Sequence, residues 1–296
     1  DLSDNPEIIF SKPYSQNVLM HSTVDYTLNT SGTHGMTKDA FDAYLFLDGK
    51  PKATTALNNT DAVQADANGV FNINSLLAVR DKRLAVTIDT VLVFKGKPYS
   101  RAGSNEFTST TGYGVAKYDN PKEMTTTDRN NIGKQYTDCP IYWLSVIYLN
   151  YAEAKAELGN LTQADLDKSV NLLQKRAGLP NMTTTPEADP ANNMNVSNLL
   201  WEIRRVRRCE LMFDNWYRYW DLIRWHQLDL LDSQKHPNIY LGANLKYLKN
   251  PEVDVNADGY MIGSNTLKQI RTFDKKHYFY PVPTGQITLN KELKQN

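Results

Sequence analysis

"RRVRRCELMFDNWYRYWDLIRW", residues 204–225, combines arginines, carboxylates and tryptophans at helical spacing. The i,i+3 neighbours of opposite charge are Arg207 with Glu210, Arg218 with Asp221, and Asp221 with Arg224. Four of the five tryptophans lie in or beside this stretch, at Trp201, Trp216, Trp220 and Trp225, and rings of that size bury the most area per residue. The pattern predicts a helix, a turn and a second helix fixed in the core by indoles and paired guanidinium groups. It disfavours a basic surface made for phosphates.

The overall charge is balanced, with 33 Lys plus Arg against 33 Asp plus Glu. No global field therefore favours nucleic acid or anionic lipid, and we expect no nucleic-acid partner. The longest apolar stretch, residues 141–151, is too short and too polar in its surroundings to span a bilayer. Two cysteines, Cys139 and Cys209, are too few for a disulfide scaffold, and each is expected to be buried and unpaired in a helical segment.

Residues 1–138 carry short strand-like segments separated by Gly, Asn, Thr and Ser clusters. The strand-like segments are "EIIFS" at 7–11, "AYLFLDG" at 43–49 and "RLAVTIDTVLVFKGKPYS" at 83–100. One exception is a short helix capped by Thr37, with Phe41, Tyr44 and Leu45 on one face. We expect a loop-rich part that carries the ligand-binding loops.

Residues 139–296 change to a helical period and predict a scaffold with an irregular tail. The first helix has an apolar stripe and ends in a left-handed cap: Ile141, Leu144, Tyr148, Tyr151 and Leu158, then Gly159. The second helix begins with Thr162 and Asp165, and Gly178 with Pro180 ends it. Its apolar face is Leu166, Val170, Leu173 and Ala177. Together they predict a hairpin of the tetratricopeptide type, which cannot bury its apolar face alone.

The remaining segments alternate between loop and helix. Residues 181–195 are expected to be a surface loop, and residues 197–232 return to helix. Residues 232–271 are irregular, and "HYFYPVP" at 277–283 predicts a short buried extended run before a polar tail.

Several motifs along the chain resemble those of SusD/RagB proteins, the surface nutrient-binding lipoproteins of Bacteroidetes. The main one is Ile203-Arg204-x-x-Arg207-Arg208-x-Glu210-Leu211-x-Phe213 followed by Arg218-Tyr219-Trp220-Asp221-Leu222-x-Arg224-Trp225. The others, in the family's order, are "NPEIIFS", "MTKDAFDAYLFLDGKP", "RDKRLAVTI", "TGYGVAKY", "IYLNYAEAKAELGN", "RAGLP" and "YFYPVPTGQITLNKELKQN". Val206 and Gln174 depart from the family's usual Glu and Arg, and these changes affect the expected ion pairs.

The resemblance implies a mainly α fold, in which tetratricopeptide-like helices pack against a loop-rich irregular part with short β-strands. Residues 1–138 and 139–296 would form one continuous SusD-like domain. About the first 40 to 45 per cent of a family member, including its lipidated cysteine, is expected to precede this segment. If residues 1–296 are expressed alone, we therefore expect exposed apolar patches on the 140–178 hairpin and aggregation.

The function implied by the resemblance is capture of a nutrient oligosaccharide and its delivery to a SusC-like TonB-dependent transporter. The protein would lie at the cell surface of the outer membrane, anchored by an N-terminal lipid. Alternatives are a peptide-binding nutrient receptor, a tetratricopeptide-like interaction scaffold and a glycan-degrading enzyme. We expect no enzyme, because the sequence has no GxSxG, HExxH, Walker or CxxC motif.

Glycan capture requires aromatic faces for sugar C–H groups and polar side chains for hydroxyls. The loops of the N-terminal half that occupy the family's variable positions offer Tyr26, Asn29, His34, Tyr99, Arg101 and Tyr113 as candidate ligand-binding residues. Each alone is also compatible with ordinary loop packing.

"DVNADGY" at 254–260 is similar to the start of an EF-hand loop. Its candidate calcium ligands are Asp254, Asn256, Asp258 and the Tyr260 carbonyl, while Asn265 stands where that loop has Glu. The alternative is an Asx-rich turn. No other cofactor is expected.

Overall fold

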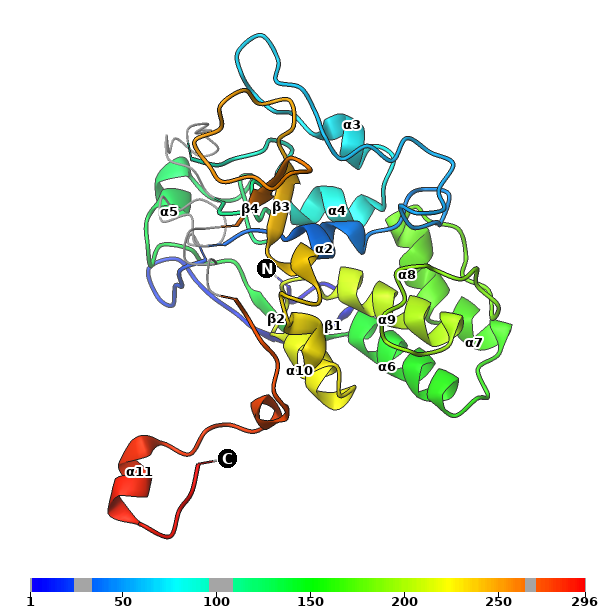
Figure 1. The fold of residues 1–296 in the computed structure, drawn as a ribbon, viewed down its shortest axis with the longest axis vertical. Helices are drawn as coiled ribbons and strands as arrows, with labels where there is room; N and C mark the ends of the chain where they lie inside the picture. Colours follow the sequence, from blue (N-terminus) through cyan, green and yellow to red (C-terminus); the bar gives the residue numbers. More distant parts are fainter. Residues whose placement is uncertain (1, 24–33, 96–108, 264–269, 296) are drawn as a thin grey trace.

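The computed structural model describes residues 2–23, 34–95, 109–263 and 270–295. Their regular secondary structure is mostly helical, with short strands in two two-stranded sheets, which confirms the expected fold class. Figure 1 shows helices α6 to α10 on one side and the loop-rich part with α2 to α5 on the other. No helix of the described residues is both long enough and apolar enough to cross a membrane.

Two antiparallel strand pairs bring distant parts of the chain together. β1 (Ile8–Lys12) pairs with β2 (Cys139–Trp143), and β3 (Leu241–Asn244) pairs with β4 (Tyr260–Ile262). The prediction that helix begins near Cys139 was wrong, because residues 139–143 add to β1. The helical period begins only at Leu144, where the backbone amide donates to Glu7 O at 2.9 Å.

The loop-rich part contains four short helices: α2 (Lys38–Asp42), α3 (Asn74–Leu77), α4 (Lys82–Thr87) and α5 (Thr126–Asn130). The helix expected after Thr37 is confirmed, since the Thr37 hydroxyl accepts the Ala40 amide at 3.3 Å. Phe41, Tyr44 and Leu45 are buried as predicted.

Two of the strand-like segments were predicted wrongly. Residues 82–87 form α4, because the Asp81 side chain accepts the Arg83 amide and caps a helix that tertiary packing then keeps. Residues 43–49 form a turn, in which the Gly49 amide donates to Phe46 O at 2.8 Å. Only isolated bridges remain, such as Phe46 with Arg80 and Ile88 with Val115.

One hydrophobic core lies under these short helices and surrounds a buried arginine. Arg80 is 1% exposed, and its guanidinium lies 4.5 Å from the Phe41 ring centre and 4.3 Å from that of Phe46. It donates to the carbonyls of Phe41 at 3.3 Å and Tyr44 at 3.1 Å. The guanidinium therefore fixes the turn after α2 from inside.

A second core lies between α6 (Leu144–Glu157), α7 (Gln163–Asp167), α8 (Val170–Ala177) and α9 (Asn198–Glu210). The predicted start and end of the second helix are confirmed by a capping box at Thr162 and a left-handed Gly178. Its four predicted apolar side chains are all buried. Residues 168–169 divide it into two helices.

The stripe predicted for α6 was wrong. The residues that pack inward are Val146, Leu149 and Ala152, whereas Leu158 is 75% exposed. α6 is apolar around much of its circumference, so its periodicity does not select a face. The buried face of α6 is instead selected by contact with Ile203 and Val206 of α9.

The arginine- and tryptophan-rich residues 204–225 lie in α9, a turn and α10 (Tyr217–Arg224), as predicted. Arg204, Arg205 and Arg207 are buried, and the pair of Asp221 with Arg224 is confirmed at 2.9 Å. The other two pairs were wrong, because Arg207 reaches Asp221 at 2.7 Å and Arg218 makes no ion pair with the described residues.

The tryptophans of this segment do not behave alike. Trp225 is buried and its indole N–H donates to Glu153, and Trp201 is partly buried. Trp216 and Trp220 are 76% and 50% exposed, which contradicts the expected burial. They lie four residues apart at the start of α10, away from the face that carries Leu222 and Trp225 into the core.

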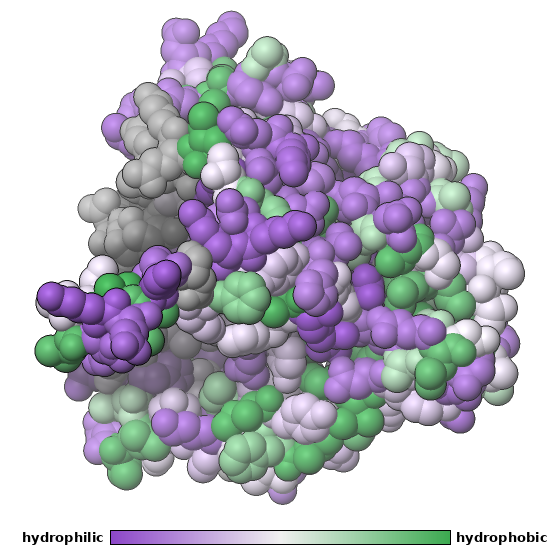
Figure 2. Space-filling view, turned by 60° about the horizontal axis from the view of Figure 1, so that its bottom comes forward, coloured by the Kyte–Doolittle hydropathy of each residue, from purple (hydrophilic) through white to green (hydrophobic). Residues whose placement is uncertain are grey.

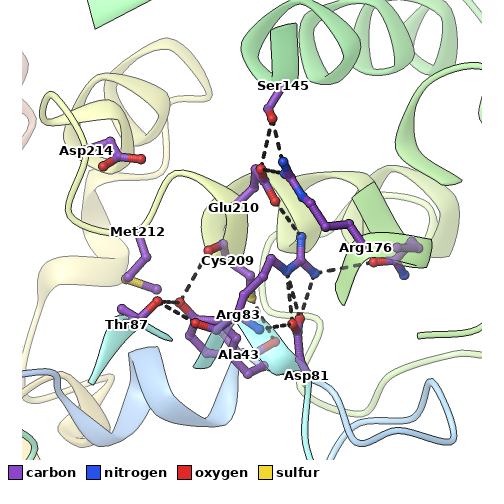
Figure 3. A network of polar contacts seen from close by, with 12 residues as sticks. Ala43, Asp81, Arg83, Thr87, Ser145, Arg176, Cys209, Glu210, Met212 and Asp214 are labelled. Atoms are coloured by element: carbon purple, nitrogen blue, oxygen red, sulfur yellow. Dashed lines mark hydrogen bonds and ion pairs between the residues drawn. The ribbon is translucent and has the colours of Figure 1, made fainter. Parts of the chain in front are cut away.

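An ion-pair network connects the two parts of the chain around Glu210 (Figure 3). Its carboxylate accepts from Arg83 Nη1 at 3.1 Å, from Ser145 Oγ at 2.9 Å and from Arg176. Arg83 also pairs with Asp81 at 2.6 Å. Both cysteines are free, as expected, although only Cys209 is fully buried.

The C-terminal segment leaves the rest of the molecule (Figure 1). It contains the short 3₁₀ helix η4 (Lys275–Tyr278) and α11 (Thr284–Leu289), which has no buried residue. The buried extended run expected at 277–283 was wrong, since Phe279 and Tyr280 are 66% and 72% exposed. Tyr278 of this run packs against a core cluster, as does Phe273 just before it.

Candidate ligand-binding cavity

A cavity of about 760 Å³ lies where several segments that are separate in the sequence meet, among them residues 51–53 and Arg271. Its walls come from α2, from the loop around residues 189–194, from α9 with α10, and from the 3₁₀ helices η1 (Leu228–Leu231) and η2 (Pro237–Ile239). This volume lies within the usual range for small-molecule sites.

The walls of the cavity carry an excess of positive charge. Seven lining side chains are cationic, namely Lys52, Arg204, Arg205, Arg208, Arg218, Lys235 and Arg271. Three are carboxylates, namely Asp39, Asp42 and Asp189. The cavity therefore favours an anionic group over a neutral or cationic one.

Each lining carboxylate already has a cationic partner. Asp189 pairs with Arg205, Asp39 with Arg208, and Asp42 with Lys38, which lies outside the cavity. Burial opposes ionisation of Asp39, but the charge of Arg208 outweighs it and holds the pKa of Asp39 below its ordinary value. Lys52 pairs with Asp61, and Arg204 pairs with Glu153 and Glu157. Among the described residues, this leaves the lining cations Arg218, Lys235 and Arg271 without an ion pair.

Arg218 is the main unneutralised charge. Among the described residues its guanidinium makes no ion pair or side-chain hydrogen bond, and it lies 6.0 Å from the Trp225 ring centre. Burial, together with repulsion from Arg208, lowers the pKa of Arg218 to about 9, so it remains charged at neutral pH. The buried Nε of Arg208 also has no hydrogen-bond partner among the described residues.

The candidate residues from the sequence divide into those that the structure describes and those that it does not. Tyr26, Asn29, Tyr99 and Arg101 fall outside the described residues. His34 is partly buried, and its carbonyl accepts the Thr110 amide at 3.2 Å. Tyr113 is only 2% exposed and stacks on Phe41 at 4.6 Å between ring centres, so core packing explains this residue and we no longer place it at a ligand.

The 254–260 segment forms a tight hairpin turn. Asn256 Oδ1 accepts the amides of Asp258 at 3.1 Å and Tyr260 at 2.9 Å, and the Tyr260 carbonyl accepts the Asn256 amide at 2.9 Å. Two of the proposed calcium ligands thus already bind backbone amides. The described residues contain no group of three or more His, Cys, Asp or Glu side chains arranged for a metal. These contacts favour the Asx-rich turn, and calcium stays an untested prediction.

The cavity could not be predicted from the sequence, because its lining residues are separated by up to about 230 positions. The one available signal was the unequal charge of residues 204–218, which contain five arginines and two carboxylates. Most of that excess is paired with carboxylates from other segments, and only the fold reveals that Arg218 is left over.

The comparisons with known proteins agree on one family. A sequence model of the SusD family matches residues 6–296. A SusD-like protein from Bacteroides fragilis superposes with a TM-score of 0.59 at 26% identity, covering 99% of this chain and 54% of its own. A SusD-like carbohydrate-binding protein from the same organism has a TM-score of 0.64 at 22% identity, covering 97% of this chain and 54% of its own. The chain thus spans about half the length of these solved relatives. Among curated proteins, none matches significantly.

Proposed function

Because the chain belongs to the SusD family, we propose that it captures a nutrient oligosaccharide at the cell surface and delivers it to a SusC-like TonB-dependent transporter. The family match over residues 6–296 carries this proposal. The similar structure of a carbohydrate-binding relative supports it through the fold. The whole protein would lie at the outer membrane, held by an N-terminal lipid.

The proposed glycan contacts are the loop residues Tyr26, Asn29, His34, Tyr99 and Arg101. Tyrosine rings cover sugar C–H patches, while amide, imidazole and guanidinium groups bind hydroxyls. Binding would not involve covalent chemistry, so the ligand would leave unchanged for the transporter.

Affinity electrophoresis on immobilised candidate glycans tests this proposal. We expect retention of the protein on at least one glycan, and a loss of about tenfold in affinity when Tyr26→Ala and His34→Ala are combined, since stacking and polar contacts would be lost together. Tyr247→Ala, which removes a 47% exposed tyrosine outside these loops, is the matched control.

Three other outcomes would change the proposed function or its site. Release of reducing ends from a retained glycan would indicate a glycan-degrading enzyme. Unaltered retention of the double variant would remove Tyr26 and His34 from the site, while absence of retention on any glycan, with binding to peptides, would favour the peptide receptor.

A further inference from the structure

We propose that the cavity between α2, α9, α10 and η2 binds an acidic saccharide, with the guanidinium of Arg218 holding the carboxylate of its uronate unit. The residues proposed to bind this saccharide are different from the loop residues proposed above. The site depends on the proposed function only for the ligand being a saccharide.

The negative charge proposed for the ligand follows from the ion pairs that the lining side chains already make. All three lining carboxylates are engaged by cations, whereas Arg218, Lys235 and Arg271 have no ion pair with the described residues. A partly buried guanidinium without a counter-ion is unfavourable. An incoming carboxylate would supply the missing partner and gain charge-assisted hydrogen bonds.

Arg218 lies where its guanidinium could bind that carboxylate through two hydrogen bonds. It enters from the first turn of α10 and lies against the Trp225 ring, beside Arg208 of α9. Arg208 uses its Nη2 for Asp39 and leaves its buried Nε without a partner. Guanidinium groups bind carboxylates through two parallel hydrogen bonds, a geometry that a lysine does not reproduce.

The size and the remaining lining groups argue for a saccharide rather than a bare ion. A water molecule takes about 30 Å³ of liquid volume, so a cavity of about 760 Å³ far exceeds one inorganic anion. Thr37, Asn193 and Asn238 offer hydroxyl and amide groups along its walls, and Pro51 and Pro190 offer small apolar surfaces. Polar groups for hydroxyls beside apolar surfaces for C–H faces fit a pyranose ring.

The test compares two disaccharides that differ mainly in one carboxylate. Titration calorimetry of the purified protein would use cellobiouronic acid and cellobiose at low ionic strength. We expect the acidic sugar to bind at least about tenfold tighter, and this preference to shrink as salt is added. Arg218→Gln should abolish the preference and Arg218→Lys should restore part of it. Lys122→Gln, an exposed cation outside the cavity, should leave it unchanged.

Several results would overturn the inference. They are equal binding of the two sugars, a preference that survives Arg218→Gln in a protein with unchanged circular dichroism, and binding of sodium sulfate without binding of cellobiouronic acid. Lys235→Gln keeps the test independent of folding, because Lys235 lines the cavity at an exposed position. This variant should reduce the preference for the acidic sugar at least about twofold. An unchanged preference would contradict the proposal. Retention of neutral glycans through Tyr26 and His34 is measured separately, so either proposal can fail alone.

Discussion

Glu210 shows how one carboxylate joins segments that are far apart in the sequence. It binds Arg83 from α4, Ser145 from α6 and Arg176 from α8, and its own side chain is 7% exposed (Figure 3). Burial acts to raise the pKa of Glu210, but the charges of Arg83 and Arg176 lower it below its ordinary value. The carboxylate is therefore charged in the folded protein and is stabilised by these partners.

Glu210→Gln should destabilise the protein by about 3 kcal/mol near neutral pH, because it leaves the buried Arg83 with one carboxylate fewer. The direction in which this stability difference changes with pH follows from the lowered pKa of Glu210. The contribution of Glu210 is present above the unfolded-state pKa of about 4.3 and is lost as pH falls through the lower folded-state pKa. The gap between parent and variant should therefore narrow below about pH 4.

Urea unfolding at several pH values measures this gap. Glu252→Gln, at an exposed carboxylate, is the control and should change stability by less than about 0.5 kcal/mol. A gap for Glu210→Gln that stays constant from neutral to acidic pH would show that the charge of Glu210 contributes nothing.

At the scale of elements, β3 depends on a close backbone contact. A Cβ added to Gly242 would lie 2.1 Å from the carbonyl oxygen of Thr111, and backbone atoms cannot yield as a flexible side chain can. The neighbouring Ala243 amide donates to that same oxygen at 2.8 Å. β3 therefore needs glycine at this position in order to pack against residues 109–115.

Gly242→Ala should lower the free energy of unfolding by at least about 2 kcal/mol, since β3 would have to move away from Thr111. Gly285→Ala is the matched control, because a Cβ there meets no atom and the residue lies in the exposed helix α11. We expect that control to be neutral or slightly stabilising. Thermal unfolding of both variants measures the difference, and equal melting temperatures would disprove the close contact.

The elements that could be predicted from the sequence carry local signals. Thr162, Asp165 and Gly178 fix the ends of α7 and α8 through caps and a left-handed turn, which depend only on nearby residues. β2 and α4 could not be predicted, because pairing with β1 decides the first and an aspartate cap with core contacts decides the second. The cavity escaped prediction for the same reason, as its charges are paired or left unpaired only by the fold.

At the scale of the whole molecule, apolar side chains remain on the surface of the helical hairpin, as expected from the sequence. Ile141, Ile147, Leu158 and Leu172 are between 38% and 75% exposed. Figure 2, which turns the bottom of Figure 1 forward, shows apolar groups gathered along the lower part of the visible surface. Exposed apolar side chains that gather on one surface promote association in water.

Residues 1–296 alone should therefore self-associate as concentration rises, which size-exclusion chromatography with light scattering measures. Ile147 and Leu158 are eleven residues apart, about three helical turns, so they share one face of α6 and its cap. The double variant Ile147→Gln and Leu158→Gln should shift the protein toward monomer without loss of cooperative melting, because glutamine keeps the helix propensity and removes the apolar surface. Val86→Gln, which changes a 67% exposed valine on α4, is the control and should leave the association unchanged. A parent chain that is monodisperse and monomeric at high concentration would show that these exposed side chains do not drive contact between molecules.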